Sequence, residues 1–302
     1  VPGGADAFVA YFDYRQLGDL LTASHALNGG EKEAEMIKAI FKATGLADLR
    51  TLVARVGFDG TDVVTRAVLE MPMPPVGVFR AYQPVDSAWF GAVDMRAVTA
   101  TAINLDAAGL YDTILDVVKT VSPDEGYLEL RKVIVDFEFE AKLRLRDGLL
   151  ASLAGPALFY TLPAGPLAQS PRGGVVVVAK LKDVSLFEKT MSALGAYVAD
   201  HSQGSLQVAA QTREDGRTVH VWAVAPLAMM GVMPAWSVAN DHVVIGSTAE
   251  LCDLGVRQLV SKDAEGKSLL DAEGYKKVTA GLPGNLVSLS YTDSRVQLQQ
   301  TL

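Results

Sequence analysis

Three kinds of side chain in this sequence could take part in chemistry: a run of acids, four histidines and a single cysteine. The acids are Asp136, Glu138 and Glu140, whose spacing on a strand would place three carboxylates on one face, where they could bind a cation. On a helix the same carboxylates would diverge. The run continues into three basic residues, Lys142, Arg144 and Arg146. Because such opposite charges are typical of a solvated face, we predict no metal site here.

Aspartate recurs just after each of four predicted strands, at Asp13, Asp94, Asp183 and Asp293. An aspartate at such a junction can accept hydrogen bonds from the free amides of the first helical turn. A catalytic site normally needs its acid only once, so recurrence favours this structural role. We therefore predict capping aspartates and assign no catalytic residue.

The common motifs of catalysis and cofactor binding are absent from the sequence. The histidines form no H-E-x-x-H pattern, which excludes a zincin site at the level of motif; they are His25, His201, His220 and His242. Gly266-Lys267-Ser268 matches only the end of a phosphate-binding loop, because Ser261 stands where its first glycine is required. Neither a G-x-S-x-G elbow nor a dinucleotide-binding G-x-G-x-x-G fingerprint is found. We predict no cofactor and no metal ligand.

Cysteine content and charge exclude further classes. Cys252 is the single cysteine, so a disulfide within the chain and a multi-cysteine metal site are excluded, and its apolar neighbours predict a buried, unreactive thiol. A net charge of −8 disfavours a nucleic-acid surface. No apolar run reaches the ~18 residues that a membrane span needs. The sequence starts at Val1 without an initiator Met, for which loss of a signal peptide or membrane anchor is one explanation.

Short apolar strands followed by amphipathic helices are the elements that would position any site. Four segments fit this pattern: FVAYFDYRQLGDLL, WFGAVDMRAVTATAI, VVVVAKLKDVSLFEKTMSAL and LVSLSYTDSRVQLQQTL, which begin at Phe8, Trp89, Val175 and Leu286. Residues 31–43 also predict a helix. Three turn pairs predict hairpins: Asp59-Gly60, Asp215-Gly216 and Asn240-Asp241.

Two segments admit more than one interpretation. Residues 132–146 alternate like a strand, but their apolar residues also fit a helical face and a helix-start signal lies near residue 123, so we predict a helix from there and leave 133–146 open. Residues 225–234 hold three methionines, which fit either packing filler, the favoured interpretation, or an adaptable binding surface.

These patterns predict an α+β fold of duplicated strand-helix-hairpin units that form antiparallel sheets flanked by helices. A weak sequence similarity between the segments TGLADLRTLVARVGF and KLRLRDGLLASLAG supports the duplication. We expect an N-terminal lobe over residues 1–155 and a C-terminal lobe over 156–302, with a soft boundary that also permits one interlocked domain.

The order of several segments resembles a bacterial family known only as a domain of unknown function. The segments are LRLRDGLLASLAG, VVVVAKLKDVSLFEKTMSAL, PAWSVANDHVVIGSTAEL, SLLDAEGYKKV and GLPGNLVSLSYTDSR. The resemblance covers about residues 142–295 and is faint before that. It implies a secreted or lipid-anchored α+β protein and brings no catalytic residues with it. The methionine-rich segment and the N-terminal half depart from the family.

Three functions are consistent with the sequence. The first is a non-catalytic extracytoplasmic protein, periplasmic or secreted, that binds or scaffolds another protein, as an accessory subunit does. The alternatives are a hydrolase with convergent carboxylates and a carrier of a small apolar ligand between the lobes. Exposed Met, Tyr or Trp on one face would favour the first, and a pocket of acids with perturbed pKa values would favour the second.

Overall fold

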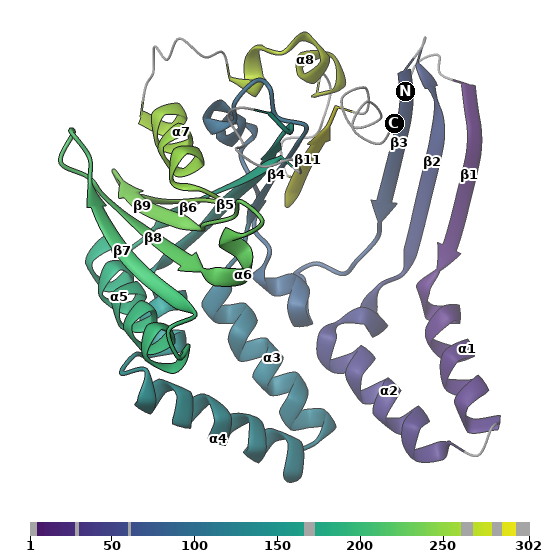
Figure 1. The fold of residues 1–302 in the computed structure, drawn as a ribbon. Helices are drawn as coiled ribbons and strands as arrows, with labels where there is room; N and C mark the ends of the chain where they lie inside the picture. The colour runs from purple at the N-terminus through teal and green to yellow at the C-terminus, as the bar shows by residue number, and fades with distance from the viewer. Residues whose placement is uncertain are drawn as a thin grey trace. The chain divides into compact units, whose positions relative to one another are not determined.

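The computed structural model describes residues 5–27, 30–59, 62–165, 173–260, 268–279 and 286–293. They form helices and antiparallel sheets, which confirms the predicted α+β class (Figure 1). The chain divides into unit 1, with Val1–Ala81 and Gly109–Ile134, and unit 2, with Tyr82–Ala108 and Val135–Leu302. The boundary expected between residues 155 and 156 falls inside a strand, which pairs along both edges and so stays within one sheet.

Unit 1 contains a three-stranded antiparallel sheet in the order β1-β2-β3. A helical pair and a short 3₁₀ turn connect the first two strands, and a second 3₁₀ turn follows the third. The elements are β1 (Ala5–Asp13), α1 (Tyr14–Leu27), α2 (Glu31–Thr44), η1 (Leu46–Asp48), β2 (Thr51–Asp59), β3 (Asp62–Leu69) and η2 (Gly77–Ala81). Most of α3 (Ala107–Val121) and the first part of α4 (Glu125–Glu140) also belong to this unit.

Unit 2 contains an eight-stranded antiparallel sheet in the order β11-β4-β5-β6-β10-β9-β8-β7. Its strands are β4 (Thr99–Asn104), β5 (Leu153–Leu162), β6 (Gly174–Leu181), β7 (Leu206–Thr212), β8 (Thr218–Val224), β9 (Ala235–Ala239), β10 (His242–Gly246) and β11 (Ser288–Thr292). Its helical elements are η3 (Ser87–Ala92), the π-helical turn η4 (Leu145–Leu149), η5 (Leu150–Ser152), α5 (Val184–His201), α6 (Ala225–Ala228), α7 (Ala249–Val260), η6 (Leu269–Asp271) and α8 (Glu273–Thr279).

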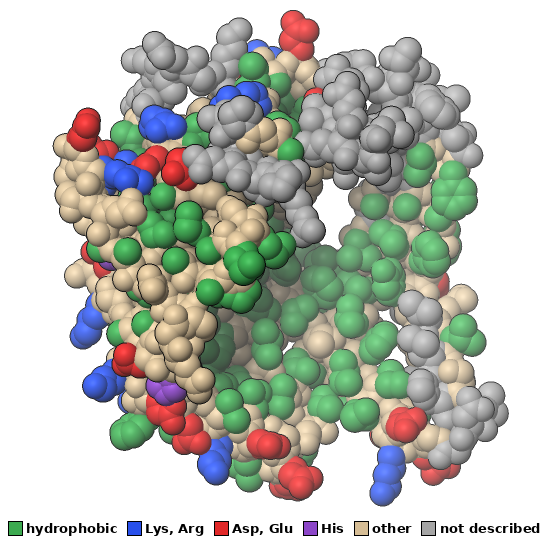
Figure 2. Space-filling view, in the orientation of Figure 1, with side chains coloured by type: hydrophobic (Ala, Val, Ile, Leu, Met, Phe, Trp, Pro, Cys, Tyr) green, Lys and Arg blue, Asp and Glu red, His purple; other side chains and the backbone are tan. Residues whose placement is uncertain are grey.

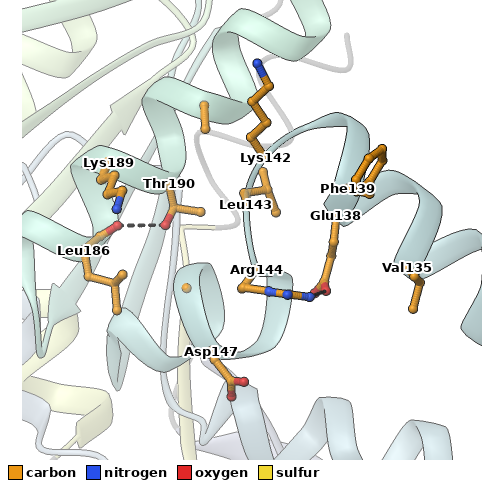
Figure 3. Close-up of a pocket in the computed structure, with 12 residues that line it drawn as sticks. Val135, Glu138, Phe139, Lys142, Leu143, Arg144, Asp147, Leu186, Lys189 and Thr190 are labelled. Atoms are coloured by element: carbon orange, nitrogen blue, oxygen red, sulfur yellow. Dashed lines mark hydrogen bonds and ion pairs between the residues drawn. The ribbon is translucent and has the colours of Figure 1, made fainter.

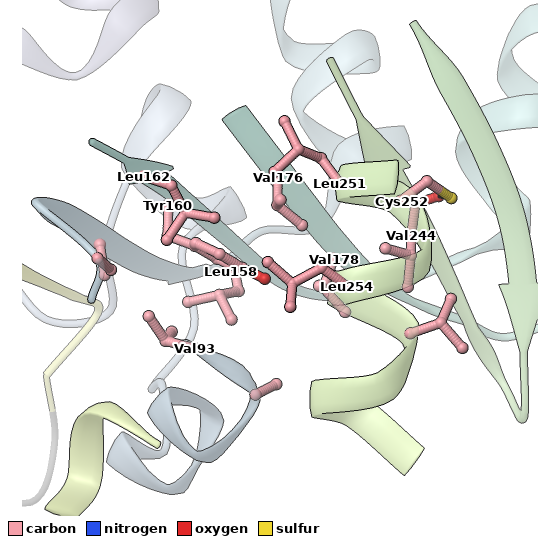
Figure 4. Packing of buried hydrophobic residues seen from close by; sticks show 14 of the residues in the cluster. Val93, Leu158, Tyr160, Leu162, Val176, Val178, Val244, Leu251, Cys252 and Leu254 are labelled. Carbon is pink, nitrogen blue, oxygen red and sulfur yellow. The ribbon is translucent and has the colours of Figure 1, made fainter. Parts of the chain in front are cut away.

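Alternate residues of the central strands of unit 2 face two different cores, as the pleat of a strand requires. In β10, Val244 packs into the larger core with α7, whereas Val243 packs into a smaller core with Phe187 of α5. Figure 4 shows the larger core, where side chains of β5, β6 and β10 meet those of α7. The sheet is therefore covered by different helices on its two faces.

Cys252 lies in the larger core and is fully buried, which confirms the predicted buried thiol. Its Sγ donates a hydrogen bond to the carbonyl of Val244 at 3.3 Å. Burial raises the thiol pKa to about 12, so at neutral pH almost no thiolate is present. We expect Ellman's reagent at pH 8 to react at least about 100-fold more slowly with the native protein than with the same protein in guanidinium. Equal rates would contradict this burial.

The predicted hairpins and the predicted helix over 31–43 are confirmed. Strands β2 and β3 pair across Asp59 and Asp62, β7 and β8 flank Asp215-Gly216, and β9 and β10 join at Asn240. Asn240 has a φ of 52°, which suits a tight hairpin turn. Residues 133–146, for which the sequence permits both a strand and a helix, are helical in their first part, since α4 continues to Glu140.

The strand-helix segments expected from Phe8 and Val175 are confirmed as β1-α1 and β6-α5. The prediction of a strand followed by a helix from Trp89 is wrong, because the 3₁₀ turn η3 comes first and the strand β4 follows it. The Asp86 carboxylate accepts a hydrogen bond from Ala88 N at 2.8 Å and so starts a helical turn where a strand was expected. The strand from Leu286 is confirmed as β11, while its predicted helix lies outside the described residues.

One order of elements occurs twice along the chain. Strand, helical pair, short helical turn and two strands occur as β1-α1-α2-η1-β2-β3 and again as β4-α3-α4-η4-η5-β5-β6. The three strands are neighbours in the same antiparallel order each time. The second copy begins at Thr99, not at Trp89 as the sequence pattern predicts. Duplication as the origin of this likeness stays a prediction.

Candidate binding surface

The edge strand β1 of unit 1 exposes large apolar side chains on both of its faces. Phe8 and Phe12 point to one side and Val9 and Tyr11 to the other, and each is between 51% and 65% exposed. Figure 2 shows apolar side chains in the region of this strand. An antiparallel sheet usually exposes only one face to water and keeps the other on a core. The exposed apolar surface of β1 is therefore a candidate binding surface.

The described part of unit 1 has a very small core of its own. Among the side chains that the structure describes there, the buried apolar ones are Ala34, Leu49 and Ala81. Neither α3 nor α4 has a buried residue. The described side chains of this unit thus bury little apolar area of their own, and the exposed side chains of β1 remain available for a partner to bury.

The backbone of β1 is also free along one edge among the described strands, since β2 is its sole neighbour. Tyr14 N donates to Arg50 O at 2.9 Å, and hydrogen-bonded pairs alternate along an antiparallel ladder. The register therefore turns the backbone groups of Phe12 and Ala10 toward β2. Those of Val9 and Tyr11 face the free edge, where they can pair with an added strand.

A second apolar surface lies in unit 2, on the methionine-rich segment. Met229 is 90% exposed, and Met230 and Met233 are each at least 40% exposed. The favoured interpretation of these methionines as packing filler is therefore wrong. Two overlapping helical turns form this segment, one closed by a bond from Met229 N to Ala225 O and the other by a bond from Met230 N to Leu227 O. They leave the methionine side chains in solvent. Exposed Met side chains form adaptable contact surfaces.

We expect Met229→Gln to change the free energy of unfolding by less than about 0.5 kcal/mol, because the side chain contributes little to a core. Urea denaturation measures this change. As a control, Met191→Gln alters a methionine that packs against the smaller core, and it should cost clearly more. Equal losses for the two variants would mean that Met229 is packed after all.

The acidic run lies on a helix and its side chains diverge. Glu138 accepts hydrogen bonds from Leu145 N at 2.8 Å and Arg144 Nη1 at 3.0 Å, so it closes the turn that follows α4. Glu140 instead lies 3.4 Å from the Tyr197 hydroxyl. In the part of the chain that the structure describes, no three His, Cys, Asp or Glu side chains are placed to hold a metal ion.

The recurring aspartates do not share one role. Asp183 caps α5 by accepting a hydrogen bond from Leu186 N at 2.9 Å, as predicted. Asp94 is buried and caps no helix, because β4 rather than a helix follows it; it binds Arg96 through two side-chain bonds of 2.8 and 2.5 Å. Asp13 is the last residue of β1 and directly precedes α1, and Asp293 directly follows β11.

The histidines occupy separate structural positions. His220 stacks on Trp236 with ring centroids 4.0 Å apart, His242 lies 2.8 Å from the Asp241 carboxylate, and Nδ1 of His201 contacts the Tyr197 carbonyl at 2.8 Å. Burial lowers the pKa of both His220 and His242. The side chain of His25, together with Gly266 and Lys267, lies outside the described residues, while Ser268 forms a capping box with Asp271.

Comparison with models of protein families, with curated proteins and with solved structures finds no match to this chain. No helix within the described ranges is long and apolar enough to cross a membrane. The sequence signal for the β1 surface was already present, since five uncharged apolar residues, Phe8–Phe12, stand in a row. Only the pairing of β1 at a sheet edge showed that they are exposed.

Proposed function

We propose that this chain is a non-catalytic extracytoplasmic binding protein, and that β1 binds an extended apolar segment of a partner protein by strand addition. The observation that carries this proposal is that β1 combines a backbone edge free of any other described strand with apolar side chains exposed on both faces. In strand addition the main chain supplies affinity and the flanking side chains supply specificity. Sparing use of cysteine and the resemblance to a secreted family support the location.

The partner's chemistry follows from the surface. Its strand should carry apolar residues on both faces, because Phe8 and Phe12 lie on one side of β1 and Val9 and Tyr11 on the other. A second copy of this chain is a poorer occupant. Pairing of two β1 strands would lengthen the two-sided apolar sheet without covering either face, whereas a partner with its own core can bury one.

The hydrolase alternative has little support in the described residues. It requires acids with perturbed pKa values gathered in a pocket. The two carboxyl groups with shifted pKa values, Asp94 and Asp215, are each held below the ordinary value, and each is paired with an arginine. Such carboxylates serve structure better than proton transfer. The carrier alternative stays a prediction.

The test selects a displayed library of random twelve-residue peptides on the purified protein and measures the Kd of a selected peptide by fluorescence anisotropy. We expect Val9→Pro to weaken binding at least about tenfold, because it removes an edge amide that the added strand needs. Tyr11→Ser keeps the backbone and should also weaken binding, through the lost side-chain contact.

Val208→Pro is the matched control. Val208 lies on β7, the edge strand of the other sheet, and faces Trp222, whose N–H bonds Pro234 O on the far side. The Val208 amide therefore also points to a free edge, and this variant should keep full affinity. If the selected peptides bind Val9→Pro and Tyr11→Ser with the same Kd as the native protein, the proposal is overturned. A native homodimer that Val9→Pro converts to a monomer would overturn it too, since the occupant would then be a second copy.

A further inference from the structure

Unit 2 contains an open cleft of about 610 Å³ that the proposed partner site does not use. It lies between the end of α4, the residues 142–144 that follow it, the π-helical turn η4 and α5 (Figure 3). This size falls within the usual range of small-molecule sites, about 300–1,000 Å³. All of its lining residues belong to the same unit.

Close packing at the base of the cleft holds its walls in place. A Cβ added at Gly148 would lie 3.1 Å from Oγ1 of Thr190, so η4 and α5 pack closely at this glycine. Leu143 is buried beside them. Lys142 adopts a φ of 51°, in the left-handed region that non-glycine residues rarely occupy and that occurs at ligand-binding turns.

Positive charge in the cleft is not balanced by its acids. Both lining acids are already paired with arginine: Glu138 with Arg144 at 3.0 Å and Asp147 with Arg146 at 2.6 Å. Lys142 and Lys189 also line the cleft, and neither has an ion-pair partner among the described residues. In a protein of net charge −8, two uncompensated lysines in one concave site favour an anion.

The α4 wall of the cleft carries exposed apolar side chains in addition to the paired Glu138. Phe139 is 83% exposed and Val135 is 48% exposed, and both lie on α4. Figure 3 shows them across the cleft from Leu186 and Lys189 of α5. Exposed apolar side chains and unpaired cations in one cleft fit a ligand that has both an apolar body and a negative head.

We propose that this cleft binds an anionic amphiphile, a molecule with a single carboxylate or phosphate head and an aliphatic chain. Lys142 and Lys189 supply the charge that attracts the head, and Val135, Phe139 and Leu186 contact the chain. A fatty acid and a lipid phosphate share this chemistry.

Calorimetric titration with decanoate and with decyl phosphate, each below its micelle concentration, tests the site. We expect saturable binding of at least one, and the tighter ligand identifies the head group. Acetate, inorganic phosphate and decanol, which carry only a head or only a chain, should bind at least about tenfold more weakly. Affinity should fall as salt is raised, because the lysines are exposed to solvent.

Three variants separate the site from general effects. Lys142→Ala and Lys189→Ala should each weaken binding about fivefold or more, and Ala193→Trp should block the chain by filling the cleft. Lys182→Ala removes the same charge outside the cleft and should bind like the native protein, as should Val9→Pro. Absence of saturable binding, or affinities unchanged in both lysine variants of proven fold, would overturn the proposal and leave the β1 site untouched.

Discussion

Arg96→Met is expected to lower the free energy of unfolding by about 3–5 kcal/mol, because it leaves a buried carboxylate without its counter-charge. Asp94 is 3% exposed, whereas the Arg96 side chain is half exposed. Besides the two bonds from the Arg96 side chain, Asp94 accepts a bond from the Arg96 backbone N–H at 2.9 Å and a weaker one from Gln258 of α7 at 3.4 Å. Removal of the arginine therefore costs more than removal of a surface cation, although both change the net charge equally.

Arg50→Met is the matched control for this prediction. Arg50 pairs with Glu70 at 3.4 Å, and both side chains are more than half exposed. Exposed pairs contribute about 0–1 kcal/mol, so urea denaturation should show little change. If Arg96→Met lost no more stability than Arg50→Met, the buried pair would not have the role assigned to it.

The effect of pH provides an independent readout of the same pair. Burial alone would raise the pKa of Asp94, but the bonds and charge of Arg96, aided by Gln258, hold it below the ordinary value of 3.8. The carboxylate thus stabilises the native protein above pH 3.8, and this contribution is lost as the pH falls through the lowered pKa.

In Arg96→Met burial is opposed only by the hydrogen bonds from the backbone N–H of residue 96 and from Gln258, because the guanidinium and its charge are gone. Burial is the largest single effect on this carboxyl, so we expect the pKa of Asp94 to rise above its ordinary value. The pH dependence of the Asp94 contribution to stability then reverses. The protonated carboxyl is the form that the buried site favours, and stability is lost as the pH rises and the carboxyl ionises. The stability difference between the two proteins should therefore shrink in acid. A difference that stays constant from neutral pH to pH 3 would contradict this assignment.

Gly246→Ala is expected to lower the free energy of unfolding by about 3 kcal/mol, at the upper end of the cost of overpacking. Gly246 ends β10, and α7 begins three residues later. A Cβ there would lie 2.3 Å from Cys252 N and 2.5 Å from Thr248 O. Both are backbone atoms at the start of α7, so the helix itself would have to move off the sheet.

Gly91→Ala is the comparison for that loss. A Cβ added at Gly91 would have the end of the Leu270 side chain as its nearest neighbour, at 3.4 Å, which is an ordinary van der Waals contact. We expect a change within about 0.5 kcal/mol in urea denaturation. A small loss at Gly246 as well would show that the β10-α7 junction tolerates a displaced helix. The native junction would then be looser than its contacts indicate.

Local signals were sufficient where a few neighbouring residues determine the backbone. The Asp-Gly and Asn-Asp turns, the capping Asp183 and the apolar stripe around Cys252 each predicted an element that the structure contains. They failed around Trp89, because its apolar residues read as a strand while Asp86 starts a 3₁₀ turn. They also did not decide between a strand and a helix for residues 133–146, since the same apolar residues fit the periodicity of both.

The candidate sites depended on contacts between distant residues. The sequence predicts only a short apolar strand from Phe8, and the structure, which places β1 at a sheet edge, shows that Phe8, Val9, Tyr11 and Phe12 are exposed. Lys142 and Lys189 come to line one cleft because η4 and α5 pack closely at Gly148 and Thr190. The sequence by itself determined the α+β class, the hairpins and the buried thiol, because turn chemistry and periodicity act over a few residues. Only the tertiary structure decided which apolar residues stay in solvent and which charges remain unpaired, because both depend on partners far away along the chain.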